Sequence, residues 1–166
     1  MWLFDVGRIV NVSSLISQYS ELYYSTYSMS KAAVTRFSET LRSEMKEFAV
    51  KVVTIMPGGY RVTELFEQTI QQMDTIWQNT DQSVGNSFGH NYYSDWRSRQ
   101  MKRLTHPILG DNPYIVVNAM FEAITCCEPN ETYVAIDGKV FAFYNYMRLY
   151  LPNCIQQLWA LMENFV

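Results

Sequence analysis

A strand, a long helix and a second strand follow one another within about fifty residues, and this order constrains the fold of the chain more than any other feature. The first strand is predicted at Arg8–Ser13, where a short apolar run follows a glycine. A helix is predicted from about residue 25 to residue 48. A β-branched strand at Val50–Met56 is stopped by Pro57-Gly58-Gly59. A βαβ unit of this kind belongs to a parallel sheet, so the predicted fold class is α/β.

The long helix is predicted to be amphipathic. A stripe of apolar residues normally marks the face of a helix that packs on the core. In this helix an apolar residue recurs every four positions, and a valine widens the stripe: Met29, Ala33, Phe37, Leu41 and Met45, with Val34.

Further elements are predicted downstream of the βαβ unit. Thr63 is expected to cap a helix in which Phe66, Ile70, Met73 and Trp77 share one face. The Gly-, Asn- and Ser-rich residues 79–91 are the best candidate for a flexible stretch. The remaining elements are a short basic helix at about 93–104, a helix from Asn112-Pro113 to about Cys126, a strand at 132–136, and an aromatic-rich tail at 140–165 with two helical pieces separated at Pro152.

Composition excludes several classes of protein. A hydrophobic content of 48% excludes a disordered chain, and a net charge of −3 argues against a nucleic-acid binder. The three cysteines, Cys126, Cys127 and Cys154, form neither a disulfide framework nor a C-x-x-C zinc motif. We therefore expect no metal site and a reducing, intracellular compartment. The adjacent Cys126 and Cys127 are interpreted as two thiols at a helix end, with a redox role as the alternative.

Tyr27 and Lys31 are the sharpest chemical feature of the chain. They stand one turn apart on the same face of the predicted helix. A free tyrosine has a pKa of about 10 and is a poor proton carrier at neutrality, but a neighbouring ammonium lowers that pKa. The pair could therefore serve as a general acid or base in alcohol and carbonyl chemistry. The alternative is a surface tyrosine beside a helical lysine, because the Y-x-x-x-K pattern is common by chance.

Two further features converge on the same edge of the predicted sheet. Ser14 lies just past the carboxyl end of the first strand, where its hydroxyl could bond a substrate oxygen. The second strand ends at Pro57-Gly58-Gly59, where the backbone can approach a ligand closely. Parallel sheets bind ligands outside the carboxyl ends of their strands, so this convergence is stronger than any one motif.

Three stretches together resemble the short-chain dehydrogenase/reductase family: GRIVNVSS at Gly7–Ser14, YSMSKAA at Tyr27–Ala33 and VVTIMPG at Val52–Gly58. The later NPYIVVNAM at Asn112–Met120 is similar to the branch that contains retinol, 17β-hydroxysteroid and D-β-hydroxybutyrate dehydrogenases. The resemblance implies a partial Rossmann-like, doubly wound parallel sheet made of the last three strands and their flanking helices. It also implies that residues 7–166 are the C-terminal part of one domain and that residues 1–6 are a short N-terminal extension.

The resemblance implies a role for each motif residue. Tyr27 would be the catalytic acid or base, and Ser14 would orient the substrate oxygen. Lys31 would lower the pKa of Tyr27 and bind the nicotinamide ribose. Pro57, Gly58 and Gly59 would line the nicotinamide pocket.

The chain also departs from the family pattern. Asn11 and Ser13 would shape the strand end, but Ser17 replaces a glycine that is common in the family. Thr63, expected to help hold the cofactor amide, stands one residue late.

The largest departure from the family pattern concerns the glycines. None of the seven forms the Gly-rich turn on which the family binds the cofactor pyrophosphate. We therefore expect the N-terminal cofactor-binding half to be missing, so that the chain is only part of a domain.

The resemblance implies an oxidoreductase that transfers a hydride between NAD or NADP, with NAD favoured by the branch, and a primary or secondary alcohol or its carbonyl counterpart. The substrate would be a retinoid, a steroid or a hydroxy acid. The alternatives are a catalytically silent homologue that binds lipid or pairs with a full-length relative, and an unstable fragment. The tail aromatics are candidates for core packing, for a substrate pocket or for peripheral membrane contact. The branch also implies a localisation at the endoplasmic reticulum membrane or in the mitochondrion. A homo-oligomer is a further expectation.

Overall fold

The computed structural model describes residues 7–19, 21–106, 109–138 and 142–143. The chain forms two compact units, one made of Met1–Gly58 with Pro113–Val166 and the other of Gly59–Asn112. The predicted tail helices and the extension at residues 1–6 lie outside the described residues.

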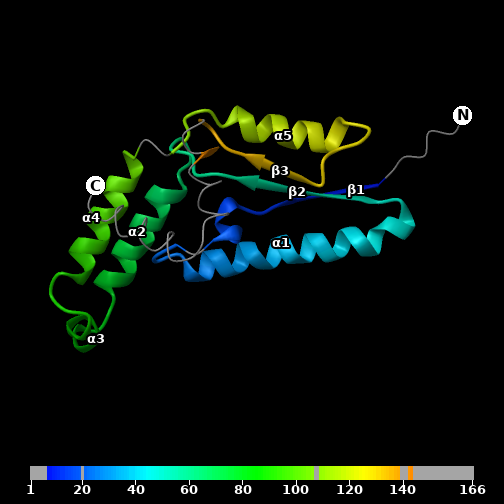
Figure 1. Ribbon diagram of the computed structural model, residues 1–166. Helices are drawn as coiled ribbons and strands as arrows, with labels where there is room; N and C mark the ends of the chain where they lie inside the picture. The colour runs from blue at the N-terminus through cyan, green and yellow to red at the C-terminus, as the bar shows by residue number, and fades with distance from the viewer. Residues whose placement is uncertain (1–6, 20, 107–108, 139–141, 144–166) are drawn as a thin grey trace, which may run out of the picture. The chain divides into compact units, whose positions relative to one another are not determined.

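The first unit contains a three-stranded parallel sheet (Figure 1). Its strands are β1 at Arg8–Val12, β2 at Lys51–Pro57 and β3 at Thr132–Ala135, in the spatial order β1-β2-β3. Both neighbouring pairs are parallel. The sheet confirms the predicted α/β class and all three predicted strands.

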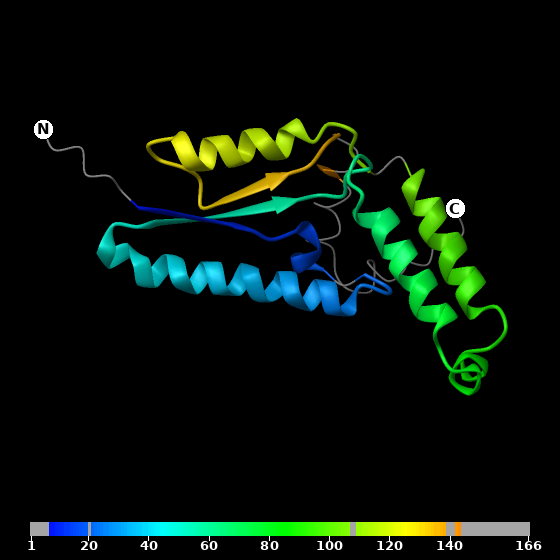
Figure 2. The ribbon, with the colours of Figure 1, turned by 180° about the vertical axis from the view of Figure 1, so that it is seen from behind.

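The centre of the sheet is β2, and one helix covers each of its faces (Figure 2). Val53 and Ile55 of β2 are buried together with Ala123 of α5, Tyr114–Thr125. The opposite face is covered by α1, Ser25–Met45, which continues as the 3-10 helix η2 at Lys46–Phe48. The β-branched run that predicted this strand is thus the core of the unit.

The face that α1 turns to the sheet is polar, contrary to the prediction from the apolar stripe. Thr35 and Ser38 are its buried residues, at 2% and 0% exposure. Met29 is 70% and Phe37 59% exposed. The apolar spacing predicted the helix correctly but not its most buried side, since Val34, Leu41 and Met45 of the stripe are only half-buried. Hydroxyl and amide partners at β1 provide hydrogen bonds that an apolar stripe could not make.

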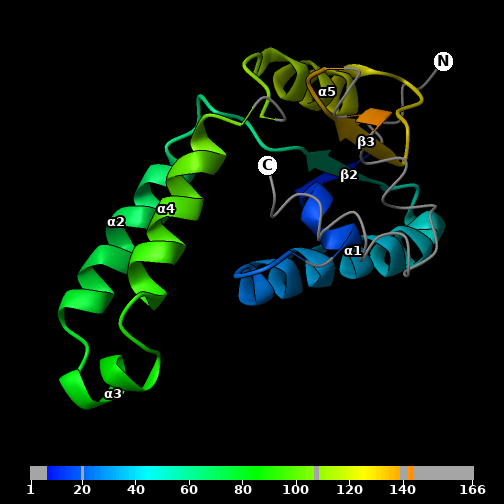
Figure 3. The same ribbon diagram turned by 60° about the vertical axis from the view of Figure 1, so that its left-hand side comes forward.

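The second unit is a helical hairpin in which α2, Leu65–Gln78, lies beside α4, Tyr92–Leu104 (Figure 3). Arg61 closes its base through hydrogen bonds to the carbonyls of Leu104 and His106 and an ion pair with Asp111 at 2.8 Å.

One prediction for this unit is wrong, and one helix of this unit was not predicted. Glu64, not Thr63, occupies the N-cap of α2, because the Thr63 hydroxyl donates to the carbonyl of Tyr60 at 2.9 Å. The stretch at residues 79–91 contains a short helix, α3 at Gln82–Ser87, whose cap is the Asp81 side chain. Asp81 accepts a hydrogen bond from the Ser83 amide at 2.8 Å, and this cap stabilises the first turn of a helix in a segment that contains Gly85.

Within the described residues, no helix is long and apolar enough to cross a membrane. The same part of the chain contains no cluster of side chains suited to hold a metal ion. Cys126 and Cys127 are free, exposed thiols just past the end of α5, while Cys154 lies outside the described residues.

Candidate active site at the carboxyl edge of the sheet

The carboxyl ends of the three strands meet at one edge. The amide of Ser13 donates to the carbonyl of Ile55 at 2.8 Å, so the pairing of β1 with β2 continues one residue past β1. The amide of Gly58 donates to the carbonyl of Ala135 at 2.8 Å, which extends the pairing of β2 with β3. Residues that follow β1 and β2 in sequence are therefore held next to each other.

Ser14 lies between the ends of β1 and β2. Its extended backbone, with φ −162° and ψ 157°, caps the 3-10 helix η1 at Leu15–Gln18. The hydroxyl accepts a hydrogen bond from the Ile16 amide at 3.4 Å and donates to the carbonyl of Pro57 at 3.5 Å. Both bonds are long, so this hydroxyl can exchange them for a stronger partner at little cost.

Ser13 has a different role, because its hydroxyl is hydrogen-bonded to α1 and holds that helix at the end of β1. It is 2% exposed, and its single hydroxyl hydrogen goes to the carbonyl of Lys31 at 2.9 Å. The Thr35 hydroxyl, 2.7 Å away, therefore donates to the oxygen of Ser13. The bond between the two hydroxyls is buried and the bond to the Lys31 carbonyl is partly buried, so the loss of either partner is costly.

A second polar contact lies further along β1. The Asn11 side-chain amide donates to the Ser38 hydroxyl at 2.9 Å, and that hydroxyl donates to the carbonyl of Val34 at 2.7 Å. With the Ser13–Thr35 pair, this contact fixes the rotation of α1 about its axis. The sequence prediction assigned Asn11 and Ser13 to the strand end but missed their helix partners. The sequence signal is the helical spacing of Lys31, Thr35 and Ser38, which places them on one face but does not pair that face with β1.

Lys31 connects the strand end to Tyr27. Its ammonium donates to the carbonyl of Val12, the last residue of β1, at 3.2 Å. The same nitrogen lies 5.9 Å from the centroid of the Tyr27 ring, within the range of a cation–π contact. The half-buried Tyr27 ring is also in edge contact with the ring of Tyr24 at 6.4 Å.

The structure thus brings Ser14, Lys31, Pro57 and Gly58 to one edge, with Tyr27 joined to them through the Lys31 ammonium. Gly59 belongs to the second unit, where a Cβ in its place would come 2.7 Å from Leu109 Cδ2. A Cβ at this position would have to displace the end of the Leu109 side chain.

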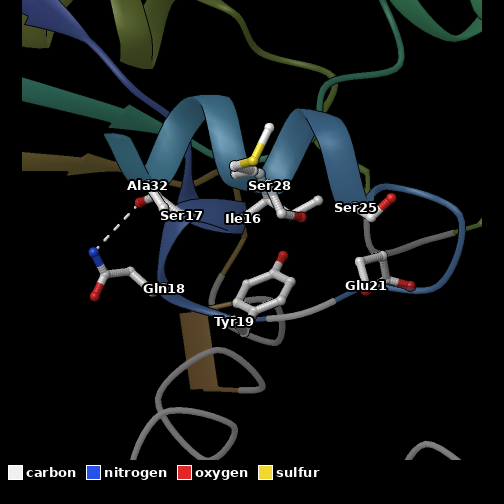
Figure 4. Close-up of a pocket in the computed structure, with 9 residues that line it drawn as sticks. Ile16, Ser17, Gln18, Tyr19, Glu21, Ser25, Ser28 and Ala32 are labelled. Carbon is white, nitrogen blue, oxygen red and sulfur yellow. Dashed lines mark hydrogen bonds between the residues drawn. The ribbon is translucent and has the colours of Figure 1, made fainter. Parts of the chain in front are cut away.

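A cavity of about 490 Å³ opens on another side of the α1 start (Figure 4). It lies between the η1 segment and the first turns of α1, and Ser28 is among its lining residues. The Ser28 oxygen is buried and has no hydrogen-bond partner within the described part of the chain. Tyr27, Ser14 and Lys31 do not line the cavity, so it is separate from the edge where they gather.

The family model described as short chain dehydrogenase matches residues 3–74, a range that contains Ser14, Tyr27 and Lys31. Mouse 17-beta-hydroxysteroid dehydrogenase type 6 is 35% identical over 138 residues, which cover 81% of this chain and 42% of that protein. The chain belongs to the short-chain dehydrogenase/reductase family.

Other relatives give the same result. Mouse retinol dehydrogenase 7 is 32% identical and human retinol dehydrogenase 16 is 31% identical, each over 90% of this chain and 47% of the relative. The chain therefore spans about half the length of the curated relatives that it matches. A short-chain dehydrogenase structure from Streptomyces avermitilis superimposes with a TM-score of 0.56 at 21% identity, covering 96% of this chain and 52% of that one. The structural likeness shows that the fold is shared with this family member.

Proposed function

We propose that the chain carries the proton-transfer and substrate-orienting residues of an NAD(P)-dependent alcohol dehydrogenase. The observation that carries this proposal is the position of the Lys31 ammonium, between the last carbonyl of β1 and the Tyr27 ring. Ser14 stands at the same strand end with two long, replaceable hydrogen bonds. The three residues supply a proton carrier, a cation beside it and a hydroxyl donor.

The roles follow from the chemistry of each group. When bound, the nicotinamide supplies or accepts the hydride at the substrate carbon. In the reducing direction, the Tyr27 phenol donates its proton to the substrate oxygen, and in the oxidising direction the phenolate takes the hydroxyl proton. Ser14 donates a hydrogen bond to the same oxygen and stabilises the negative charge that develops there.

The residues at the strand end fit the nicotinamide ribose. The Lys31 ammonium has three hydrogens and uses one for Val12, which leaves two for ribose hydroxyls. Pro57 and Gly58 place no charged side chain at this edge. The choice between NAD and NADP stays a prediction, with NAD favoured by the branch. The compartment also stays a prediction, with the endoplasmic reticulum membrane and the mitochondrion as the two candidates.

The names of the relatives support a retinoid or steroid alcohol as the substrate, with the hydroxy acid as a third class. A chimera tests the proposal, in which this chain replaces the aligned stretch of mouse retinol dehydrogenase 7. Tyr27→Phe should lower kcat by about 10²- to 10⁴-fold, because the proton carrier is lost. Tyr24→Phe is the matched control, since its ring touches that of Tyr27, and it should retain turnover. Equal activity of Tyr27→Phe and the unmodified chimera would refute the role of Tyr27.

A second candidate is a catalytically silent homologue that binds lipid or pairs with a full-length relative. The 166 residues by themselves contain no pyrophosphate-binding turn, because none of their seven glycines has its spacing. We expect that calorimetric titration of the 166-residue chain with NAD and NADP gives no measurable binding. Micromolar binding would contradict this expectation and favour a self-sufficient enzyme.

A further inference from the structure

The closed end of the second unit presents large apolar side chains to solvent. The short helix α3 lies at the end of the hairpin away from its base (Figure 3). Around it, Ile76 is 60%, Val84 49% and Phe88 52% exposed. We call residues 76–93 the hairpin tip.

Aromatic rings pack on one another within the tip, and the exposed Phe88 is one of them. The Trp77 and Tyr93 rings are stacked, with centroids 5.1 Å apart and planes 8° from parallel. Phe88 packs on Tyr92 at 4.9 Å and contacts Trp77 edge-on at 6.4 Å. Because the tip is already ordered by these contacts, docking would require little loss of conformational freedom.

The hairpin tip is almost free of charge. Between residues 76 and 93 the sequence contains one carboxylate, Asp81, and neither lysine nor arginine. That carboxylate caps α3 through the Ser83 amide at 2.8 Å. A strongly charged partner, including an anionic lipid surface, would find no complementary charge here.

We propose that the hairpin tip docks on the surface of a zwitterionic phospholipid layer. Ile76, Val84 and Phe88 would enter the acyl boundary, while the Trp77 and Tyr92 rings would lie at the level of the headgroups, where tryptophan and tyrosine are enriched. A convex end fits a fluid surface, which closes around it without a preformed groove.

The exposed area favours lipid over a folded protein partner. A stable protein interface buries about 800 Å² on each side. Three half-exposed side chains at the end of a hairpin do not approach that area, whereas insertion into lipid needs only the transfer of apolar groups from water. The dehydrogenase proposal and this one are independent, because no residue of the candidate active site takes part.

Sedimentation with phosphatidylcholine vesicles tests the proposal on the full 166-residue chain. The double variant Val84→Ser/Phe88→Ser should lower the partition coefficient by about tenfold or more, because two apolar groups no longer leave water. The matched control is Val117→Ser/Phe121→Ser, which removes two exposed apolar side chains from α5 and should leave partitioning unchanged. Circular dichroism should show unchanged helix content in both variants, and the single variant Ile76→Ser is the substitute if the tip double variant does not fold.

Added phosphatidylserine should not strengthen binding, and salt should not weaken it, because the tip has neither lysine nor arginine. The proposal is overturned if the unmodified chain does not bind phosphatidylcholine or if the tip variant binds as well as the unmodified chain. It is also overturned if the α5 variant loses as much binding as the tip variant, or if binding requires the anionic lipid.

Discussion

Two substitutions on α1 test whether its polar face is the one that packs on the sheet. Phe37 belongs to the apolar stripe yet is 59% exposed, while Thr35 is polar yet 2% exposed. Truncation of a buried phenylalanine to alanine costs about 3–5 kcal/mol. For Phe37→Ala we expect a loss of about 1 kcal/mol or less, because most of the ring stays in water and alanine favours the helix.

Thr35→Val should be the more damaging change, although it conserves the shape of the side chain. It removes the donor to the buried Ser13 oxygen at 2.7 Å, which leaves that oxygen without an accepted hydrogen bond. A buried polar group that loses its partner costs about 1–3 kcal/mol. In a chain of this length we expect Tm to fall by about 2–4 °C for each kcal/mol.

Urea unfolding followed by circular dichroism measures both values, with an unchanged m confirming that stability alone has changed. A loss of about 3 kcal/mol or more for Phe37→Ala, together with no loss for Thr35→Val, would refute the assignment of the buried face. That result would mean that the apolar stripe is in the core after all.

Two further predictions concern Asp74 in the hairpin and the neighbouring serines Ser13 and Ser14 at the end of β1. The hydrogen bond from Tyr93, followed by the interactions with Arg97, holds the pKa of Asp74 below its ordinary 3.8. Asp74 therefore stabilises the hairpin above pH 3.8, and this stability is lost as the pH falls through the lowered pKa. Thermal melts at decreasing pH should show a steeper loss for the unmodified chain than for Asp74→Asn, and parallel profiles would contradict the linkage. Ser13→Ala should cost about 1–3 kcal/mol of stability, because one buried and one partly buried hydrogen bond are lost. Ser14→Ala should leave Tm nearly unchanged while it lowers kcat of the chimera, and the reverse order would refute the separate roles of the two serines.

The sequence predicted the strands, the long helix and their parallel order, because β-branched runs and helical spacing act over a few residues. It also predicted that Ser14 and Pro57 would meet, since the carboxyl ends of parallel strands share an edge. The buried side of α1 could not be predicted in this way. That side depends on partners such as Ser13 and Asn11, which are distant in sequence and become neighbours only after the sheet has formed.

The polar docking of α1 also explains how a helix can hold site residues at a strand end. Apolar faces can shift against each other at little cost, whereas a hydrogen bond is lost when its partners move apart or out of line. A rotation of α1 by one residue would break the contacts of Thr35 with Ser13 and of Ser38 with Asn11 together. It would also carry the Lys31 ammonium away from the carbonyl of Val12. The buried hydroxyls therefore serve the site indirectly, since they admit only the rotation that places Lys31 at the strand end with the Tyr27 ring beside its ammonium.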